Sequence, residues 1–308
     1  MGDFGNQPYF AAMSEVPVTL IGPPRPPRGN RPLVIVGVVG IVLVGLLWIG
    51  LLGRITSGGR VVPGVAVAVG ESAAVGDPES LAEIAANKLL RPGAPLAEVD
   101  CALPKLTTDP AGLRAYYEAG IGCLDRAWQP VVVGAGLPFS SPKLNIDVKP
   151  RAKCGFTPSE DEATAFYCER DRTIYMPQDR LERDAGEETA FHLAVLAHEY
   201  GHHVQALSGI LQAAGNREVL AGDEEAQQLS RRTELEANCF AGAFLAAARG
   251  RGAVSAAVAD ESVVSFDDTL DSDSHGSADN QGMWAERGYE DKTTAACDTW
   301  SAPAGEVS

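Results

Sequence analysis

The sequence predicts an α+β domain that follows a disordered N-terminal tail and a single transmembrane helix. Three observations support this prediction. Residues 33–53 form an uncharged apolar run, residues 187–212 and 224–249 have helical spacing, and TIYM at 173–176 has the β-branched and aromatic residues of a strand. Hydrophobic residues make up 45% of the 308-residue chain, an ordinary share for a protein with a folded core.

The N-terminal tail is predicted to be disordered, because residues 1–32 are rich in proline and glycine and show no apolar period.

The net charge of the whole chain is −16, and no stretch forms a basic face that could neutralise phosphates. Nucleic acid is therefore excluded as an expected partner.

The apolar run LVIVGVVGIVLVGLLWIGLLG at 33–53 is predicted to be the transmembrane helix. At 1.5 Å per residue it spans about 30 Å, the thickness of a bilayer core. A cleaved signal peptide is the alternative, but its apolar region is usually shorter, about 7–15 residues, and closer to the N-terminus. Three arginines precede the run, and Arg54 and Arg60 follow it, which favours a cytoplasmic N-terminus. We therefore expect a single-pass protein of the cell membrane with its folded domain outside the cell.

The folded domain is predicted to occupy residues 79–308, after a linker at 54–78 that is rich in glycine and valine. Its first helix is expected at 111–130, where the apolar residues recur at helical spacing and Pro130 ends the pattern. The TIYM strand and the two long helical segments follow in that order.

The cysteines support the extracellular placement. All six lie after the apolar run, and an even number is typical of disulfides formed outside the cytoplasm. Of the fifteen possible pairings, we favour the one between nearest neighbours. Buried free thiols, the default in a cytosolic chain, are the alternative. The favoured pairs are Cys101–Cys123, Cys154–Cys168 and Cys239–Cys297.

The motif HEYGHHVQ, starting at His198, points to a metal site. On a helix, His198 and His202 lie about 40° apart around the axis, so both imidazoles reach one point. The pattern H-E-x-x-H supplies two neutral imidazoles for zinc and a carboxylate, Glu199, that can take a proton from metal-bound water. His203 and His192 lie off this face and are not predicted to be ligands.

Zinc in a catalytic site usually has a third protein ligand. A histidine six residues after the second, as in metzincins, is absent because that position is Ser208. The candidates are Glu234 and Glu236 in the second long helix, which point about 200° apart, so only one can face the site. Glu234 shares its face with Asn238 and Glu236 shares its face with Phe240. The geometry favours Glu234 and leaves Glu236 open.

These motifs together resemble a known family. HEYGHHVQ and ELEANCFAG, with FYCERDRTIYM upstream and HGS and CDTW near the C-terminus, resemble the neutral zinc metallopeptidases of bacteria over roughly residues 95–300. The resemblance implies a zincin-like fold, in which the active-site helix carries H-E-x-x-H and a second helix carries E-x-x-A-D. It also implies that Glu234 is the third ligand.

Two positions depart from the family pattern. Asn238 stands where the family has an aspartate, which would accept the second N–H of a ligating histidine. Asparagine can still accept this hydrogen bond through its carbonyl, but without a charge. Gln281 stands where the family has an arginine, which weakens any expectation of anion recognition nearby.

Two further residues carry predictions. His275, in SHGS, is the one unassigned histidine in the region of resemblance, and we expect it to stabilise the oxyanion of a tetrahedral intermediate. An ordinary loop histidine is the alternative. The strand of Tyr175 could form an edge along which a peptide adds as a further strand, but a plain core strand is the favoured interpretation.

The predicted function is a membrane-anchored, extracytoplasmic zinc metallopeptidase that acts on a peptide or protein. One Zn²⁺ on His198, His202 and Glu234 would lower the pKa of its water toward about 7. Glu199 would accept the proton of that water and pass it to the leaving amine. The main alternative is a catalytically silent, zinc-binding scaffold module, and a second is a structural protein without metal. The sequence predicts no oligomeric state.

Overall fold

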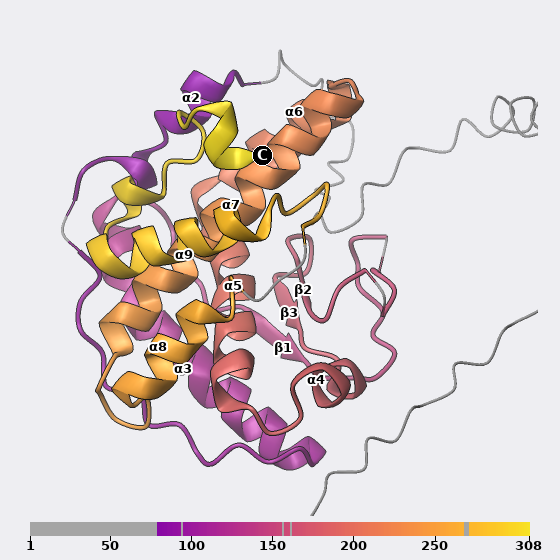
Figure 1. The fold of residues 1–308 in the computed structure, drawn as a ribbon, viewed down its shortest axis with the longest axis vertical. Coiled ribbons are helices and arrows are strands. Elements are labelled where there is room, and N and C mark those ends of the chain that lie inside the picture. The colour runs from indigo at the N-terminus through magenta and orange to yellow at the C-terminus, as the bar shows by residue number, and fades with distance from the viewer. Residues whose placement is uncertain (1–78, 94, 156, 161, 268–270) are drawn as a thin grey trace, which may run out of the picture. The chain divides into compact units, whose positions relative to one another are not determined.

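The computed structural model describes residues 79–308 except 94, 156, 161 and 268–270 (Figure 1). The predicted tail at 1–32, transmembrane helix at 33–53 and linker at 54–78 lie outside the described residues. Within the described part of the chain, no helix is long and apolar enough to cross a membrane.

The described residues form an α+β structure in which helices predominate and the sheet is small, as Figure 1 shows. The elements in chain order are α2 (Leu81–Ala85), the 3-10 helix η1 (Lys88–Leu90), α3 (Pro110–Gly134), β1 (Lys143–Asn145), β2 (Phe166–Cys168), β3 (Thr173–Tyr175), α4 (Gln178–Ala185), α5 (Thr189–Ser208), α6 (Ile210–Leu220), α7 (Asp223–Ala248), α8 (Ala256–Val264), α9 (Ala278–Asp291), η2 (Thr294–Cys297) and η3 (Ala304–Val307).

Helix α7 is the central element of the helical part, and it matches the helix predicted at 224–249. It is buried along most of its length, and it packs on α5, α6, α8 and α9. Small residues let α9 approach closely: a Cβ atom on Gly288 of α9 would lie 1.9 Å from the carbonyl oxygen of Cys239 on α7. The two backbones therefore touch where α7 carries its functional residues.

Replacing Gly288 with alanine is expected to destabilise the fold by about 1–3 kcal/mol, because the added methyl group overlaps the α7 backbone. Gly215, in the middle of α6, is the matched control, since a Cβ there meets no atom within 4 Å. Its alanine variant should be neutral or up to about 1 kcal/mol more stable. Urea unfolding measures the free energy of unfolding of both variants, and equal stability of the two would disprove the close contact.

Two predicted helix boundaries are wrong. The helix predicted at 111–130 continues past Pro130 to Gly134. The proline removes one backbone hydrogen bond, but Val132, two residues later, is fully buried, so packing outweighs that loss. The long helix predicted at 187–212 is two helices, because Gly209 adopts a left-handed φ of 83° that ends α5, and α6 runs on to Leu220.

The sheet has the strand order β1-β3-β2, with β1 parallel and β2 antiparallel to β3. The predicted strand TIYM is therefore the central strand, and both of its sides are paired. Tyr175 is 3% exposed and stacks on Phe166. The idea of peptide addition along this strand is wrong, and the interpretation as a core strand is confirmed.

All six cysteines are paired as predicted, in the disulfides Cys101–Cys123, Cys154–Cys168 and Cys239–Cys297. Three disulfides are typical of a domain that folds outside the cytoplasm. The third disulfide joins α7 to η2, close to the C-terminus, and so connects the central helix to the last segment of the chain.

Candidate metal centre

The three residues predicted to bind metal meet where α5 packs against α7. Gly201 makes this packing possible, because a Cβ there would lie 2.9 Å from the carbonyl oxygen of Ala237 on α7. The Nε2 atoms of His198 and His202 lie 3.1 Å apart, and each lies 3.2 Å from Oε2 of Glu234. Two imidazole nitrogens and one carboxylate oxygen thus converge on a space that one ion could occupy.

The structure shows which of the two candidate glutamates, Glu234 or Glu236, lies at the histidine pair. Glu234 faces the histidine pair and is 1% exposed. Glu236 points to the other side, where it accepts hydrogen bonds from Gln205 and from the indole N–H of Trp300. Burial raises the pKa of Glu236 to about 8, although these two N–H donors oppose the rise.

Hydrogen bonds to the outer ring nitrogens orient both imidazoles. Nδ1 of His198 lies 2.7 Å from Oδ1 of Asn238, and Nδ1 of His202 lies 2.8 Å from Oε1 of Gln205. Both partners are acceptors, so each Nδ1 carries a hydrogen and each Nε2 is the ring nitrogen left to bind a metal at the centre. Asn238 thus accepts through its carbonyl, in the place where the family has an aspartate. Two imidazoles oriented in this way and a carboxylate fit the ligand preferences of Zn²⁺.

The buried carboxyl group of Glu234 is in a state that suits a bound cation. Burial opposes ionisation of Glu234, but His202 and His275 hold the pKa of its carboxyl well below the usual range. Burial likewise disfavours a charged His202, yet the Glu234 carboxylate raises the pKa of that imidazole to about 9. The buried carboxylate is therefore ionised and is stabilised by positive charge, which a metal ion would also provide.

Glu199 lies beside the ligand atoms on α5 and is 5% exposed. Burial raises the pKa of its carboxyl, and the neighbouring His198 and His202 only partly oppose this. Its Oε2 has no hydrogen-bond partner among the described residues. A carboxylate with a raised pKa and a free oxygen can accept a proton from water near neutral pH and give it back.

His275 reaches the same centre from the loop before α9. Its Nε2 lies 3.3 Å from Oε2 of Glu234, and its Nδ1 lies 2.9 Å from the hydroxyl oxygen of Ser274. The remaining histidines lie elsewhere, as predicted. His203 contacts the Tyr167 hydroxyl and a backbone carbonyl, and His192 likewise contacts a tyrosine hydroxyl and a backbone carbonyl.

A cleft of about 700 Å³ leads to the centre, and His198, Glu199 and His275 are among the residues that line it. One wall is the face of α5 that carries Phe191, Ala194 and Val195, at helical spacing before His198. Further lining residues include Phe266, Asn238, Gln281, Glu160, Arg183 and Asp184. The cleft thus has an apolar wall beside the candidate metal ligands, and charged groups from α4 and the segment before β2 line another part of the cleft.

Sequence reasoning missed three side chains of this region. Gln205 lies three residues after His202, so the helical spacing alone could have placed it beside the imidazole. Phe266 and Trp300 come from segments far away in the sequence. No local pattern marks either residue as a neighbour of the metal centre.

The model of a protein family described as "Putative neutral zinc metallopeptidase" matches residues 114–300. Among curated proteins, YpfJ of Escherichia coli is 28% identical over 186 residues, which cover 54% of this chain and 63% of YpfJ. Rv2575 of Mycobacterium tuberculosis and Mb2605 of Mycobacterium bovis are 29% identical over 209 residues, 58% of this chain and 68% of each relative. The match thus spans less than two thirds of YpfJ. No solved structure matches the chain significantly.

Proposed function

Since this chain belongs to the neutral zinc metallopeptidase family, whose model matches residues 114–300, we propose that it is a zinc-dependent peptidase of zincin-like fold. The observation that supports this most strongly is the convergence of His198, His202 and Glu234, with Glu199 beside them. The family match supports the class of reaction, and the geometry supports the roles of the individual residues.

In the proposed mechanism, His198, His202 and Glu234 would hold one Zn²⁺. When bound, zinc supplies a Lewis acid that polarises the scissile carbonyl and makes water more acidic. Glu199 accepts the proton of the attacking water on its free oxygen and passes it to the leaving amine. Asn238 and Gln205 keep the two imidazoles oriented throughout.

His275 is proposed to stabilise the oxyanion. It lines the cleft together with His198, and the centroids of the two imidazole rings are 6.5 Å apart. The Glu234 carboxylate raises the pKa of His275 against the effect of burial, which favours a protonated imidazole whose Nε2–H lies beside the candidate metal ligands, 3.3 Å from Oε2 of Glu234. This supports the role that the sequence predicted for it.

The substrate is proposed to be a peptide with an apolar side chain near the cleaved bond. The wall formed by Phe191, Ala194 and Val195 lies on the same helix face as His198, so such a side chain would pack there while the scissile carbonyl faces the ligands. The three disulfides support an extracytoplasmic location. Anchoring in the membrane through residues 33–53 is part of the proposal.

Removal and return of the metal test the proposed function. We expect the full-length chain loaded with zinc to cleave members of a random peptide library, with a preference for sites beside large apolar residues. A zinc chelator should stop cleavage, because the remaining groups cannot polarise the carbonyl, and added zinc should restore it. Mass spectrometry of the peptide products measures the site preference and the loss and return of cleavage.

Two negative results point to the alternatives. A chain that binds zinc tightly but cleaves no peptide would be a zinc-binding module without catalysis, an outcome that Asn238 and Gln281 would then help to explain. A folded chain that binds no zinc would rule out the metal centre altogether.

A further inference from the structure

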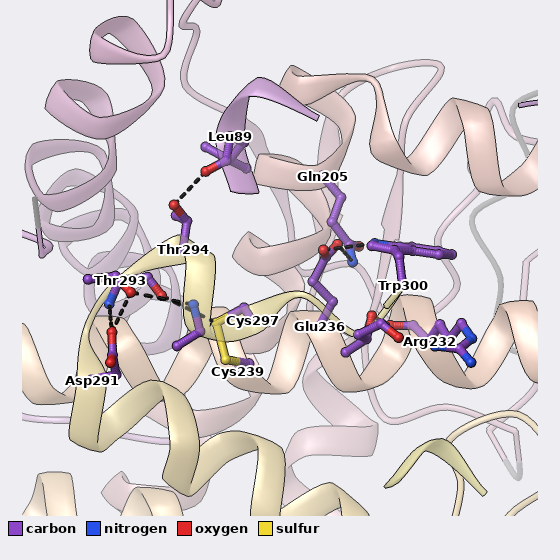
Figure 2. The surroundings of a disulfide bond; sticks show 12 residues. Leu89, Gln205, Arg232, Glu236, Cys239, Asp291, Thr293, Thr294, Cys297 and Trp300 are labelled. Atoms are coloured by element: carbon purple, nitrogen blue, oxygen red, sulfur yellow. Dashed lines mark hydrogen bonds between the residues drawn. A yellow bond between two sulfur atoms is a disulfide. The ribbon is translucent and has the colours of Figure 1, made fainter. Parts of the chain in front are cut away.

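Glu236 has a buried carboxyl group that the proposed mechanism does not use. It lies on α7, two residues after Glu234, and is 0% exposed. Its Oε2 accepts from Nε2 of Gln205 at 2.8 Å, and its Oε1 accepts from Nε1 of Trp300 at 2.9 Å, as Figure 2 shows. Both oxygens thus act as acceptors for donors from other parts of the chain. A buried carboxyl group held in this way has a defined position.

The contacts of Gln205 allow only one orientation of its amide. Its Nε2 lies 2.8 Å from Oε2 of Glu236 and 2.8 Å from the backbone carbonyl oxygen of Thr233, and a carbonyl can only accept. A flipped amide would place its oxygen against both acceptors. The carbonyl of Gln205 must therefore face Nδ1 of His202, at 2.8 Å, and that nitrogen must carry the hydrogen.

We propose that Glu236 is a positioning residue of the metal centre. Through Gln205 it holds His202 in the one tautomer and ring orientation that leave Nε2 free to bind a metal. The inference rests on the metal centre of the proposed function, but not on catalysis.

The C-terminal segment fixes Glu236 in turn. Arg232, Glu236 and Cys239 follow one another at helical spacing on one face of α7, and residues 297–300 lie along this face (Figure 2). Cys297 is bonded to Cys239 at one end. At the other end, Thr299 and Arg232 exchange hydrogen bonds. Trp300, 2% exposed, is thereby held with its indole N–H on Glu236.

The first test replaces Glu236 with glutamine, which has the same shape. The new side chain has one acceptor and one donor, so either Gln205 or Trp300 would face an NH₂ group with its own N–H. We expect the zinc affinity of the full-length chain to fall about 10–100-fold. Competition with a chromophoric chelator measures the affinity. The visible spectrum of the Co²⁺-loaded chain should change as well, because it reports the ligand geometry.

Trp300→Phe is the second variant, and it decides the question if Glu236→Gln does not fold. It keeps an aromatic ring but removes the indole N–H, and we expect zinc affinity to fall about three- to ten-fold. The matched control is Thr294→Val. Thr294 lies in the same C-terminal segment, but its hydroxyl donates a buried hydrogen bond to the backbone carbonyl of Leu89 and not to Glu236 or Gln205 (Figure 2). This variant should lose stability but keep the zinc affinity and the Co²⁺ spectrum of the wild type.

Three results would overturn the inference. Folded Glu236→Gln and Trp300→Phe chains with wild-type zinc affinity would exclude a positioning role. An equal loss in Thr294→Val would show a general effect of destabilisation. A wild-type chain that binds no metal would remove the centre itself. Weaker zinc binding by Glu236→Gln in a chain that cleaves no peptide would support the inference and overturn only the proposed catalysis.

Discussion

Replacement of Glu199 by glutamine is expected to lower kcat/KM for peptide hydrolysis by about 10²–10⁴-fold while zinc stays bound. Glutamine has nearly the same shape, but its amide cannot accept the proton of the attacking water. The ligand atoms belong to His198, His202 and Glu234, so the affinity for zinc should change little. Cleavage of a peptide substrate and zinc content are measured on the same preparation.

The control for this variant is Glu224→Gln. Glu224 is an exposed carboxylate in the first turn of α7 and is not among the residues that line the cleft. The same change there should leave turnover unaltered. Wild-type turnover by the Glu199→Gln chain would show that another group accepts the proton.

Replacement of Glu234 by alanine is expected to weaken zinc binding more than about 100-fold. Loss of a residue that only hydrogen-bonds to a ligand typically weakens metal binding about 10–100-fold, and Glu234 is itself a proposed ligand. The change removes a ligand atom and also the buried negative charge that His202 and His275 face. Two imidazoles alone would leave zinc without the three protein ligands typical of catalytic sites. Titration against a chelator of known affinity measures the change.

Glu224→Ala, on the same helix, serves as the control and should bind zinc as the wild type does. A Glu234→Ala chain with unaltered zinc affinity would exclude Glu234 as a ligand. Glu236→Gln should show an intermediate loss, because it disturbs the orientation of His202 but removes no ligand.

Much of the centre could be predicted because its spacing is local. His198 and His202 are one helical turn apart, and this brings their imidazoles together in any context that keeps the helix. Helix geometry favoured Glu234 and left Glu236 open, and the family resemblance then indicated Glu234; in the structure Asn238, on the same face as Glu234, holds His198. The disulfides followed from cysteines that are neighbours in sequence.

The features that depend on tertiary packing could not be predicted. The helix through Pro130 continues because Val132 is buried against other elements, which no local propensity shows. The contact between Trp300 and Glu236 joins segments far apart in the chain. The central position of Tyr175's strand likewise depends on β1 and β2, which lie before it and have no strong strand pattern.

The zinc content of the full-length chain, purified with its three disulfides formed, tests the metal centre most directly. Metal analysis by mass spectrometry counts zinc per chain after dialysis against metal-free buffer. We predict one zinc per chain, held by His198, His202 and Glu234. A folded, oxidised chain that retains no zinc and takes up none when it is added would contradict the metal centre and the peptidase with it.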